Sequence, residues 1–294
     1  MQLIADKWAN KKPVLLDGAT GTELNLRGVS TRLPLWSAAA LWEAPEVLLQ
    51  VHRDYVQAGA EIITANTFRT HARNLRAGGI RPELARRWTC RAVELAQEAA
   101  AGKACVAGSM APLEDCYSPE LTPDDATLAA EHAEMAGHLA EAGVDLILVE
   151  TQPTLREARA ATTAAMQTGK PVWVSFVCSP QGALLSEENL LQAAQSVLAL
   201  GPQALLVNCV SAVCGLHLLQ ILNQATNTIP VGIYANIGQP DPIHGWQQTS
   251  AQFPDAYAHF AQSWLQAGAS IIGGCCGTTP EHIGLLRNLT TGAS

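Results

Sequence analysis

The chain has 294 residues, of which 48% are hydrophobic and 15% are charged, and its formal net charge is −8. This composition favours one globular domain over residues 1–294, and a negative charge without a Lys/Arg-rich run argues against nucleic acid or an anionic membrane as partner. No stretch approaches the roughly 18 apolar residues of a membrane span, and residues 1–13 lack the apolar run of a secretory signal. We therefore expect a cytoplasmic protein that acts on small molecules.

Short aliphatic runs alternate with alanine-rich helical segments along the whole chain, as in a parallel sheet whose strands are buried on both faces. The predicted strands are residues 13–16, 60–65, 104–108, 144–149, 171–177, 204–207, 230–234 and 270–273. The predicted helices are residues 45–58, 81–101, 124–142, 154–167, 189–200, 215–224 and 257–266. Gly59, Gly143 and Gly268 each precede a strand, where a left-handed helix stop is expected. This alternation predicts a (β/α)8 TIM barrel rather than an open doubly wound sheet.

Residues capable of chemistry follow most of the predicted strands. They are Asp17, Asn66 and Thr67, Glu150 and Thr151, Asn208 and Cys209, Asn236, and Cys275 and Cys276. Because active sites of this barrel form at the carboxyl ends of the strands, we expect these side chains to converge on one mouth. His244 lies in a loop near the same mouth, whereas the other histidines lie mostly within or near helices and are interpreted as surface or packing residues.

Three cysteines give the sharpest signal. Cys209 ends the sixth predicted strand, and the adjacent pair Cys275 and Cys276 ends the eighth, so the three sulfurs are expected on one rim. Three thiolates suit zinc, and a tetrahedral ion then keeps the open position that distinguishes a catalytic from a structural site. The glycines around the pair are expected to allow unusual backbone angles that point two consecutive side chains at one ion; they are Gly273, Gly274 and Gly277.

Other interpretations of the cysteines remain open. The chain has 8 cysteines and no export signal, which favours free thiols or metal ligation over disulfides. A free cysteine is most often a small buried hydrophobe, the interpretation favoured for Cys90, Cys105 and Cys178, and on that view the adjacent pair is plain core in a different barrel enzyme. Cys214 is a possible fourth ligand of a structural zinc site, although it lies beyond the strand end, near the next helix.

The ligand set indicates which chemistry to expect. Zinc with three thiolates has a net negative formal charge, which makes it a poor Lewis acid for water and a good activator of thiols. A thiol bound at the fourth position is held as the nucleophilic thiolate. The expected reaction is attack of this sulfur on the methyl group of a sulfonium or quaternary ammonium donor. Such a transfer neutralises a cation and an anion, so a closed, water-poor pocket favours it.

Several residues are candidates for binding the substrates. Asp17 and Glu150 are expected to bind an ammonium group. An alternative role for Asp17 is to form a turn or cap a helix, and an alternative role for Glu150 is to pair with an arginine of the barrel. Thr67 and the backbone amides near Gly18 and Ala19 are candidates for a carboxylate.

A cationic methyl donor is favoured by an aromatic face near the metal. Trp36, in the loop after the first strand, is the best placed tryptophan, followed by Trp246 and Trp42. Each of these also has the simpler interpretation of a packing anchor.

The motifs occur in a familiar order. They are DGATGTEL (17–24), LPLWSAAAL (33–41), TANTF (64–68), VETQP (149–153), NCV (208–210), YANIG (234–238) and GGCCGTTPEHI (273–283). Together they resemble the homocysteine S-methyltransferase family across essentially the whole chain, above all its short bacterial and plant enzymes. Those enzymes use S-methylmethionine, and also S-adenosylmethionine, to make methionine. The resemblance implies a (β/α)8 barrel with zinc on Cys209, Cys275 and Cys276.

The resemblance also implies that Asp17 and Glu150 bind homocysteine, with Thr67 alongside, and it makes selenium analogues of homocysteine plausible substrates. Betaine-using relatives have a tyrosine where this chain has Thr151, which argues against betaine but leaves it as an alternative donor. Asn236 lies in YANIG where many relatives read YPNSG, a difference expected on the donor side. A zinc- or thiol-binding protein without turnover is the alternative from another class.

Overall fold

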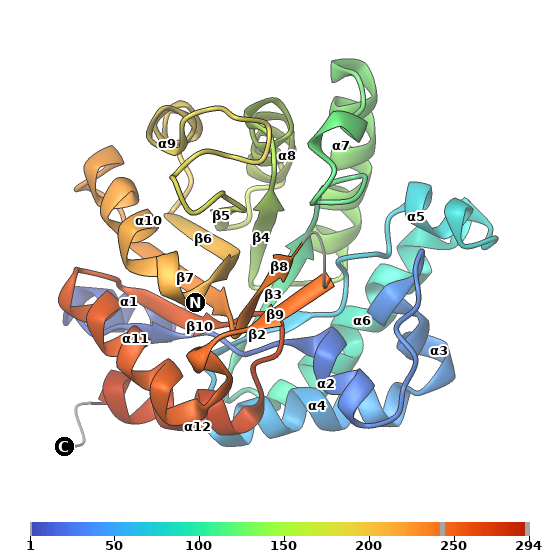
Figure 1. Cartoon of the computed structure of the whole chain (residues 1–294). Coiled ribbons are helices and arrows are strands. Elements are labelled where there is room, and N and C mark those ends of the chain that lie inside the picture. The colour runs from blue at the N-terminus through green and yellow to red at the C-terminus, as the bar shows by residue number, and fades with distance from the viewer. Residues whose placement is uncertain (1, 242–244, 292–294) are drawn as a thin grey trace.

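Eight parallel strands form a barrel in the computed structural model, which describes residues 2–241 and 245–291 (Figure 1). The strands pair in the order β1-β10-β7-β6-β5-β4-β3-β2. A parallel bridge between Leu16 and Ile62 joins the first strand to the second, and the Asp17 N–H donates to the Ile62 carbonyl at 3.0 Å, which closes the ring. The predicted (β/α)8 barrel is therefore confirmed. His244 lies outside the described residues.

The barrel strands agree with the predicted ones apart from their ends. They are β1 (Val14–Leu15), β2 (Ile62–Ala65), β3 (Cys105–Met110), β4 (Leu146–Gln152), β5 (Val172–Phe176), β6 (Ala204–Ser211), β7 (Val231–Asn236) and β10 (Ile271–Gly274). Every residue of β4 and β5 is buried, which explains why residues 146–149 and all of β5 except Ser175 are apolar. Strands β4, β6 and β7 run past the predicted ends, so several of the candidate polar residues lie within strands.

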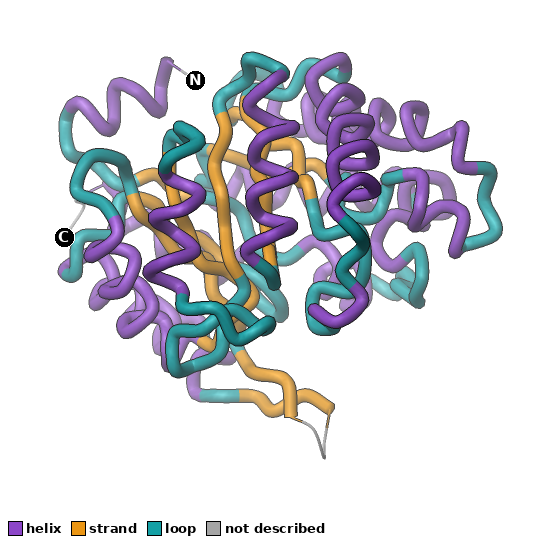
Figure 2. The backbone as a smooth tube through the Cα atoms, turned by 90° about the horizontal axis from the view of Figure 1, so that it is seen from above, coloured by secondary structure: helices purple, strands orange, loops and turns teal. Residues whose placement is uncertain are grey.

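Helices surround the strands on the outside of the barrel (Figure 2). They are α1 (Gln2–Ala9), α2 (Thr20–Leu26), α3 (Ala40–Glu43), α4 (Pro45–Ala58), α5 (Ala72–Ala77), α6 (Ala85–Ala100), α7 (Asp125–Glu141), α8 (Leu155–Gln167), α9 (Leu190–Leu198), α10 (Ala212–Ala225), α11 (Pro254–Gln266) and α12 (Pro280–Thr291), with 3-10 turns at Trp36–Ala39, Pro82–Leu84, Pro119–Leu121 and Ser250–Gln252. All predicted helices are present. Gly59, Gly143 and Gly268 have φ values of 109°, 84° and 97°, as expected of left-handed helix stops. Among the described helices, none combines the length and apolar character needed to cross a membrane.

Helix α1, which the sequence pattern did not predict, seals the amino end of the barrel. Ile4 is fully buried, and the ring of Trp8 lies 5.5 Å from that of Trp173, near the start of β5. Lys7 donates to the carbonyl of Pro13 at 2.8 Å, just before β1. Because this end is filled by apolar side chains, a cavity can open only at the carboxyl ends of the strands.

A second unpredicted element follows β7. Strands β8 (Gly238–Asp241) and β9 (Gly245–Gln248) pair antiparallel and project from the body of the molecule (Figure 2). Trp246 lies on this hairpin and packs over Gly238, where a Cβ atom would fall 2.7 Å from the indole nitrogen. The indole of Trp246 therefore packs against the backbone of its own hairpin.

Candidate metal and substrate site

A cavity of about 440 Å³ opens at the carboxyl ends of the strands. Most of the predicted site residues line it: Asp17, Gly18, Trp36, Asn66, Glu150, Thr151, Asn208, Cys209, Cys275 and Cys276. Thr67 and Asn236 do not line it. The convergence expected from the strand ends is thus present, and the volume suits one or two amino-acid-sized ligands.

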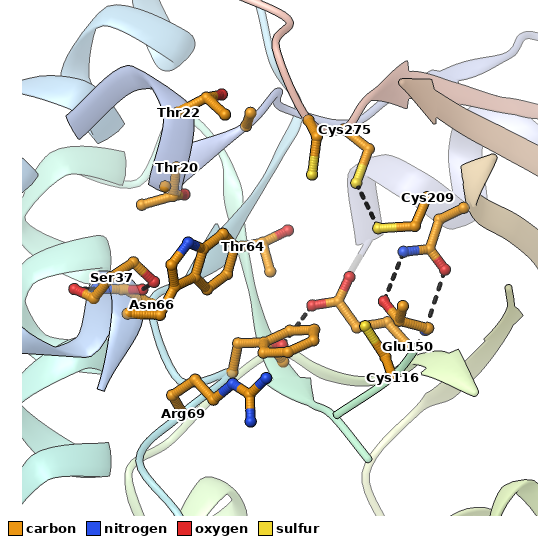
Figure 3. A pocket seen from close by; sticks show the side chains of 18 of the residues that line it. Thr20, Thr22, Ser37, Thr64, Asn66, Arg69, Cys116, Glu150, Cys209 and Cys275 are labelled. Carbon is orange, nitrogen blue, oxygen red and sulfur yellow. Dashed lines mark hydrogen bonds between the residues drawn. The ribbon is translucent and has the colours of Figure 1, made fainter. Parts of the chain in front are cut away.

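The sulfurs of Cys209, Cys275 and Cys276 lie within 4.8 Å of one another, although Cys209 lies 66 residues before Cys275 in the sequence. The Cys209 and Cys275 sulfurs are 3.1 Å apart (Figure 3). No other cluster of three such ligand groups occurs among the residues that the structure describes. Cys214 does not join this cluster, because its thiol donates to the Ser211 carbonyl at 3.1 Å in the first turn of α10. The proposed fourth cysteine ligand is therefore not supported.

The protonation of the three thiols is uneven. Hydrogen bonding to Cys275 and Cys276 raises the pKa of the Cys209 thiol, whereas hydrogen bonds from Cys209 and Cys275 lower the pKa of Cys276. One sulfur thus carries negative charge most readily, and its neighbours retain their protons. Three adjacent thiolates in a buried site repel one another, so a bound cation is needed to ionise all of them. The donor set therefore fits a metal ion.

The backbone that directs the cysteines differs from the expectation. A positive φ of 54° occurs at Cys209, within an irregularity of the register between Asn208 and Ser211. Gly273 and Gly274 have no positive φ; a Cβ atom at Gly274 would fall 2.2 Å from the Thr278 hydroxyl oxygen. These two glycines are needed for close packing rather than for unusual angles, which corrects the prediction. Gly277 does have a positive φ of 84°.

Asp17 forms one side of the substrate end of the cavity. Its carboxylate accepts hydrogen bonds from the Thr64 N–H at 2.7 Å and the Thr64 hydroxyl at 3.1 Å. Burial raises the pKa of Asp17 to about 7 against the effect of these hydrogen bonds, and the nearby charge of Glu150 adds to the rise. The N-cap of α2 is Ala19, not Asp17, so Asp17 does not cap this helix.

Glu150 lies in an irregularity of β4 between Val149 and Gln152. The Ser109 hydroxyl donates to one carboxylate oxygen, and the Tyr234 hydroxyl donates to the other at 3.0 Å. Burial raises the pKa of Glu150 to about 7, although the Ser109 hydrogen bond opposes the rise. No described arginine pairs with this carboxylate. A cavity containing two buried carboxyl groups of raised pKa suits a ligand that brings its own positive charge.

Asn208 holds two strand ends together. Its side-chain oxygen accepts from the Thr151 N–H at 3.0 Å and the Ser175 hydroxyl at 2.6 Å, and its NH₂ group donates to the Thr151 hydroxyl at 2.7 Å. Asn208 also lines the cavity. Its hydrogen bonds nevertheless indicate that it positions Thr151 and Cys209, which lie in the register irregularities of β4 and β6.

Thr67 and Asn236 lie behind the cavity wall. The Thr67 hydroxyl donates to the Ser109 carbonyl at 2.8 Å. The Asn236 side-chain oxygen accepts from the Cys276 N–H at 3.0 Å, and its NH₂ group has no hydrogen-bond partner among the described residues. Both residues therefore support groups at the site, and direct contact of either with a substrate stays a prediction. The Ala19 amide predicted for a carboxylate already donates to the Thr278 hydroxyl at 3.2 Å.

Two aromatic rings, those of Trp36 and Phe68, form an aromatic wall of the cavity. The rings of Trp36 and Phe68 meet edge to face with centroids 5.7 Å apart, and both residues line the cavity. Trp36 has a positive φ of 47° and presses on Gly21, where a Cβ atom would fall 2.4 Å from the indole. Of the other tryptophans considered, Trp246 packs on its own hairpin and Trp42 packs against Trp88. Trp36 is therefore the tryptophan at the site.

The sequence interpretation missed several lining residues: Thr64, Phe68, Arg69, Ser109, Cys116, Tyr117 and Tyr234. Tyr234 had a usable signal, because it lies two residues before Asn236 in a strand and therefore shares its face. Ser109 lies near the end of β3, where a polar residue fits the strand-end rule. Cys116 and Tyr117 lie in the β3–α7 loop, for which the pattern gave no signal.

Together, the fold and the site define a (β/α)8-barrel protein with three clustered cysteines beside two buried carboxyl groups in one cavity. The family model for homocysteine S-methyltransferase matches residues 14–290. A homocysteine S-methyltransferase of Escherichia coli is 32% identical, covering 93% of this chain and 94% of the relative. A selenocysteine methyltransferase of Astragalus bisulcatus is 28% identical, covering 96% and 94% respectively.

Solved structures agree. The homocysteine methyltransferase MmuM of Escherichia coli, in its metallated form, superposes with a TM-score of 0.84 at 29% identity over 98% of this chain and 99% of that one. The chain belongs to the homocysteine S-methyltransferase family, and it is a methyltransferase. The resemblance inferred from the sequence motifs is thereby confirmed.

Proposed function

We propose that residues 1–294 act as one zinc-dependent domain that transfers a methyl group from a sulfonium donor to L-homocysteine, giving methionine. The donors are S-methylmethionine and S-adenosylmethionine. The observation that carries the proposal is the placement of three cysteine sulfurs and two buried carboxyl groups in one cavity. The names of the relatives, which include homocysteine and selenocysteine methyltransferases, support the acceptor class.

The cysteine cluster fits zinc. Zinc–sulfur bonds of about 2.3 Å place the sulfurs of a tetrahedral site about 3.8 Å apart, and the three sulfurs here lie within 4.8 Å of one another. Cys209 and Cys275, at 3.1 Å, need to separate only slightly. When bound, zinc supplies an open fourth position that holds a substrate thiol as thiolate.

Asp17 and Glu150 account for the amino-acid end of the acceptor. Each carboxyl group is held by hydrogen bonds from fixed donors, which leaves it oriented for a further partner. An ammonium group between them offsets the burial that raises their pKa values, so both become charged when homocysteine binds. A simple thiol without an ammonium group leaves this part of the cavity unmatched. The carboxyl pair therefore favours homocysteine over simple thiols.

The aromatic wall accounts for the donor. The faces of Trp36 and Phe68 attract a sulfonium cation and exclude water from it. In the transfer, an S–CH₃ bond forms to the acceptor sulfur as the donor S–CH₃ bond breaks, and its electron pair stays on the donor sulfur. The cationic donor leaves as a neutral thioether, and no proton moves in this step. Thr151, in place of the tyrosine of betaine-using relatives, supports a sulfonium donor.

A donor panel tests the proposal. Purified protein is incubated with homocysteine and one donor at a time, namely S-methylmethionine, S-adenosylmethionine or betaine, with and without a chelator, and methionine is measured. Methionine from the sulfonium donors that disappears with chelator and returns with zinc is the expected result. If methionine forms with betaine and with neither sulfonium donor, betaine is the donor and the sulfonium assignment is wrong. Zinc retention and homocysteine binding without any product would overturn turnover in favour of a binding protein.

Selenium analogues form a second acceptor arm, because a selenolate binds zinc as a thiolate does. Selenohomocysteine is expected to be methylated with the same donor preference. We place the reaction in the cytoplasm, since none of the 8 cysteines forms a disulfide among the described residues, which suits a reducing compartment.

A further inference from the structure

Arg69 is the one cationic side chain among the described residues that line the cavity, whose charged or readily ionised neighbours are carboxyl and thiol groups. It follows Phe68 in the loop between β2 and α5 and lines the cavity. Among the described residues, no carboxylate lies within 4.0 Å of its guanidinium group. Its Nε is buried without a hydrogen-bond partner among the described residues, and its side-chain hydrogen bond to Asn74 Oδ1 is long at 3.4 Å. A half-buried guanidinium with unused donors is suited to an anionic ligand.

The surroundings hold Arg69 in place without using its charge. The Asn74 NH₂ group donates to the Arg69 carbonyl at 2.9 Å, which fixes the backbone of the loop. The guanidinium carbon lies 5.6 Å from the centre of the Phe68 ring, next to the aromatic wall formed with Trp36. A positive group and two aromatic rings therefore adjoin one another on the same side of the cavity.

Two groups of the acceptor, its sulfur and its ammonium group, have partners other than this arginine. Its sulfur belongs at the cysteine cluster and its ammonium group between Asp17 and Glu150. Figure 3 shows Arg69 on the opposite side of the pocket from Cys209 and Cys275. A methyl donor must bring its sulfonium centre to the acceptor sulfur, so the rest of the donor extends away from the cysteines, along the aromatic wall.

We propose that Arg69 binds the carboxylate of the methyl donor and thereby selects sulfonium donors that are amino acids. The inference rests on the proposed function. The sulfonium lies against Trp36 and Phe68, and the carboxylate at the other end of the donor receives the free N–H groups of Arg69. Two amino acids are thus told apart in one cavity, because the acceptor is held by carboxyl groups and the donor by a guanidinium.

Two matched donors test this assignment. S-methylmethionine and its α-carboxamide share the sulfonium centre and differ in the carboxylate. Their kcat and KM are measured with wild type, Arg69→Gln, Arg69→Lys and, as a control, Arg76→Ala, whose arginine is exposed on α5. Zinc content and thermal unfolding are recorded for each variant. Arg69→Gln removes the positive charge and keeps a polar side chain with part of the methylene stem, and Arg69→Lys restores the charge.

The wild type is expected to favour the acid over the amide by roughly 10- to 100-fold in kcat/KM, the range for a charge-assisted hydrogen bond. In Arg69→Gln the preference for the acid is expected to fall to within about threefold, because the KM for S-methylmethionine rises. The KM for homocysteine is expected to stay unchanged. Arg69→Lys is expected to recover part of the preference, and Arg76→Ala all of it.

Two outcomes would overturn the assignment. One is an equal loss on the acid and the amide in Arg69→Gln, or no loss on either. The other is a rise in the homocysteine KM at unchanged donor KM, which moves Arg69 to the acceptor. A wild type that makes no methionine from either donor refutes the proposed function itself, so the two failures are distinguishable.

Discussion

The side-chain amide of Asn208 bonds both the N–H and the hydroxyl of Thr151, at 3.0 Å and 2.7 Å. Thr151 follows Glu150 on β4, and Asn208 precedes Cys209 on β6, so one amide couples the carboxylate bulge to the cysteine bulge across β5. Both bulges contain a residue of positive φ, 59° at Thr151 and 54° at Cys209. Such backbone persists only where surrounding contacts determine it, and Asn208 supplies those contacts.

Replacing this amide is expected to disturb metal binding as well as stability. Asn208→Ala leaves the Thr151 N–H and the Ser175 hydroxyl without their acceptor, and each unsatisfied buried group costs about 1–3 kcal/mol. We expect the free energy of unfolding to fall by about 3 kcal/mol and zinc to bind more weakly. Urea denaturation and zinc titration check this. Ser175→Ala, which removes one bond, serves as the milder control, and equal zinc affinity in both variants contradicts the coupling.

The metal assignment predicts a sharp contrast between cysteines. Cys276→Ala is expected to lose bound zinc and methyl transfer while keeping its far-UV circular dichroism, because the barrel strands pair independently of the metal. Cys90→Ser, on helix α6 and away from the cavity, is expected to keep both. Zinc per chain is measured by atomic absorption after dialysis. Retained zinc and activity in Cys276→Ala would falsify the three-cysteine site.

The raised pKa values of Asp17 and Glu150 predict how stability depends on pH in the metal-free protein. Burial favours the neutral carboxyl, so the folded state binds more protons than the unfolded chain between about pH 4 and pH 7. Stability should therefore fall as pH rises through this window, by up to about 1.4 kcal/mol per pH unit for each carboxyl.

Asp17→Asn removes one of these carboxyls and should reduce the slope, whereas Asp255→Asn, at an exposed position, should not. The measurement is the free energy of unfolding from urea denaturation at several pH values between roughly 4.5 and 7.5, which covers most of the predicted window. A slope that is the same in wild type and Asp17→Asn argues against a neutral, buried Asp17.

The same two carboxyls predict proton release on ligand binding. L-methionine, the expected product, presents an ammonium group that favours the charged carboxylates. At pH 6, below the pKa of about 7, its binding should release protons and tighten as pH rises. Calorimetry in buffers of different ionisation enthalpy measures the number released. The ammonium-free analogue 4-(methylthio)butanoate is the matched control, and equal proton release by both ligands counts against the assignment.

The contact between Gly21 and Trp36 gives a prediction for the donor wall. A Cβ atom at Gly21 would fall 2.4 Å from the indole, so Gly21→Ala must displace the ring. We expect Gly21→Ala and Trp36→Ala to raise the donor KM in parallel, by roughly tenfold for a lost cation–π contact of about 1–2 kcal/mol. Trp36→Phe should be milder. A change in the homocysteine KM alone would show that the indole serves the acceptor.

The barrel and the cysteine cluster could be predicted because both follow from order along the chain. Buried strands are apolar over most of their length, and the polar residues at or after their carboxyl ends lie at the mouth. The pairings of Asp17 with Thr64 and of Glu150 with Tyr234 could not be predicted, since they depend on the register of strands that meet only when the barrel closes.

The short elements were missed for a different reason. Helix α1 and the β8–β9 hairpin have too few residues to show a clear period, and tertiary contacts determine them. The positive φ of Cys209 was expected at glycines instead, because the sequence shows which residues tolerate such a conformation and not which are forced into it.

The residues of the cavity come from two kinds of segment, strand ends and connecting loops, and this has an evolutionary consequence. Asp17, Glu150 and the cysteines lie at strand ends, whose geometry the whole barrel determines. Trp36, Phe68 and Arg69 lie in connecting segments, where substitutions disturb the fold least. A lineage built on this barrel can therefore exchange one methyl source for another by altering a few connecting residues, while its chemistry at sulfur is inherited unchanged.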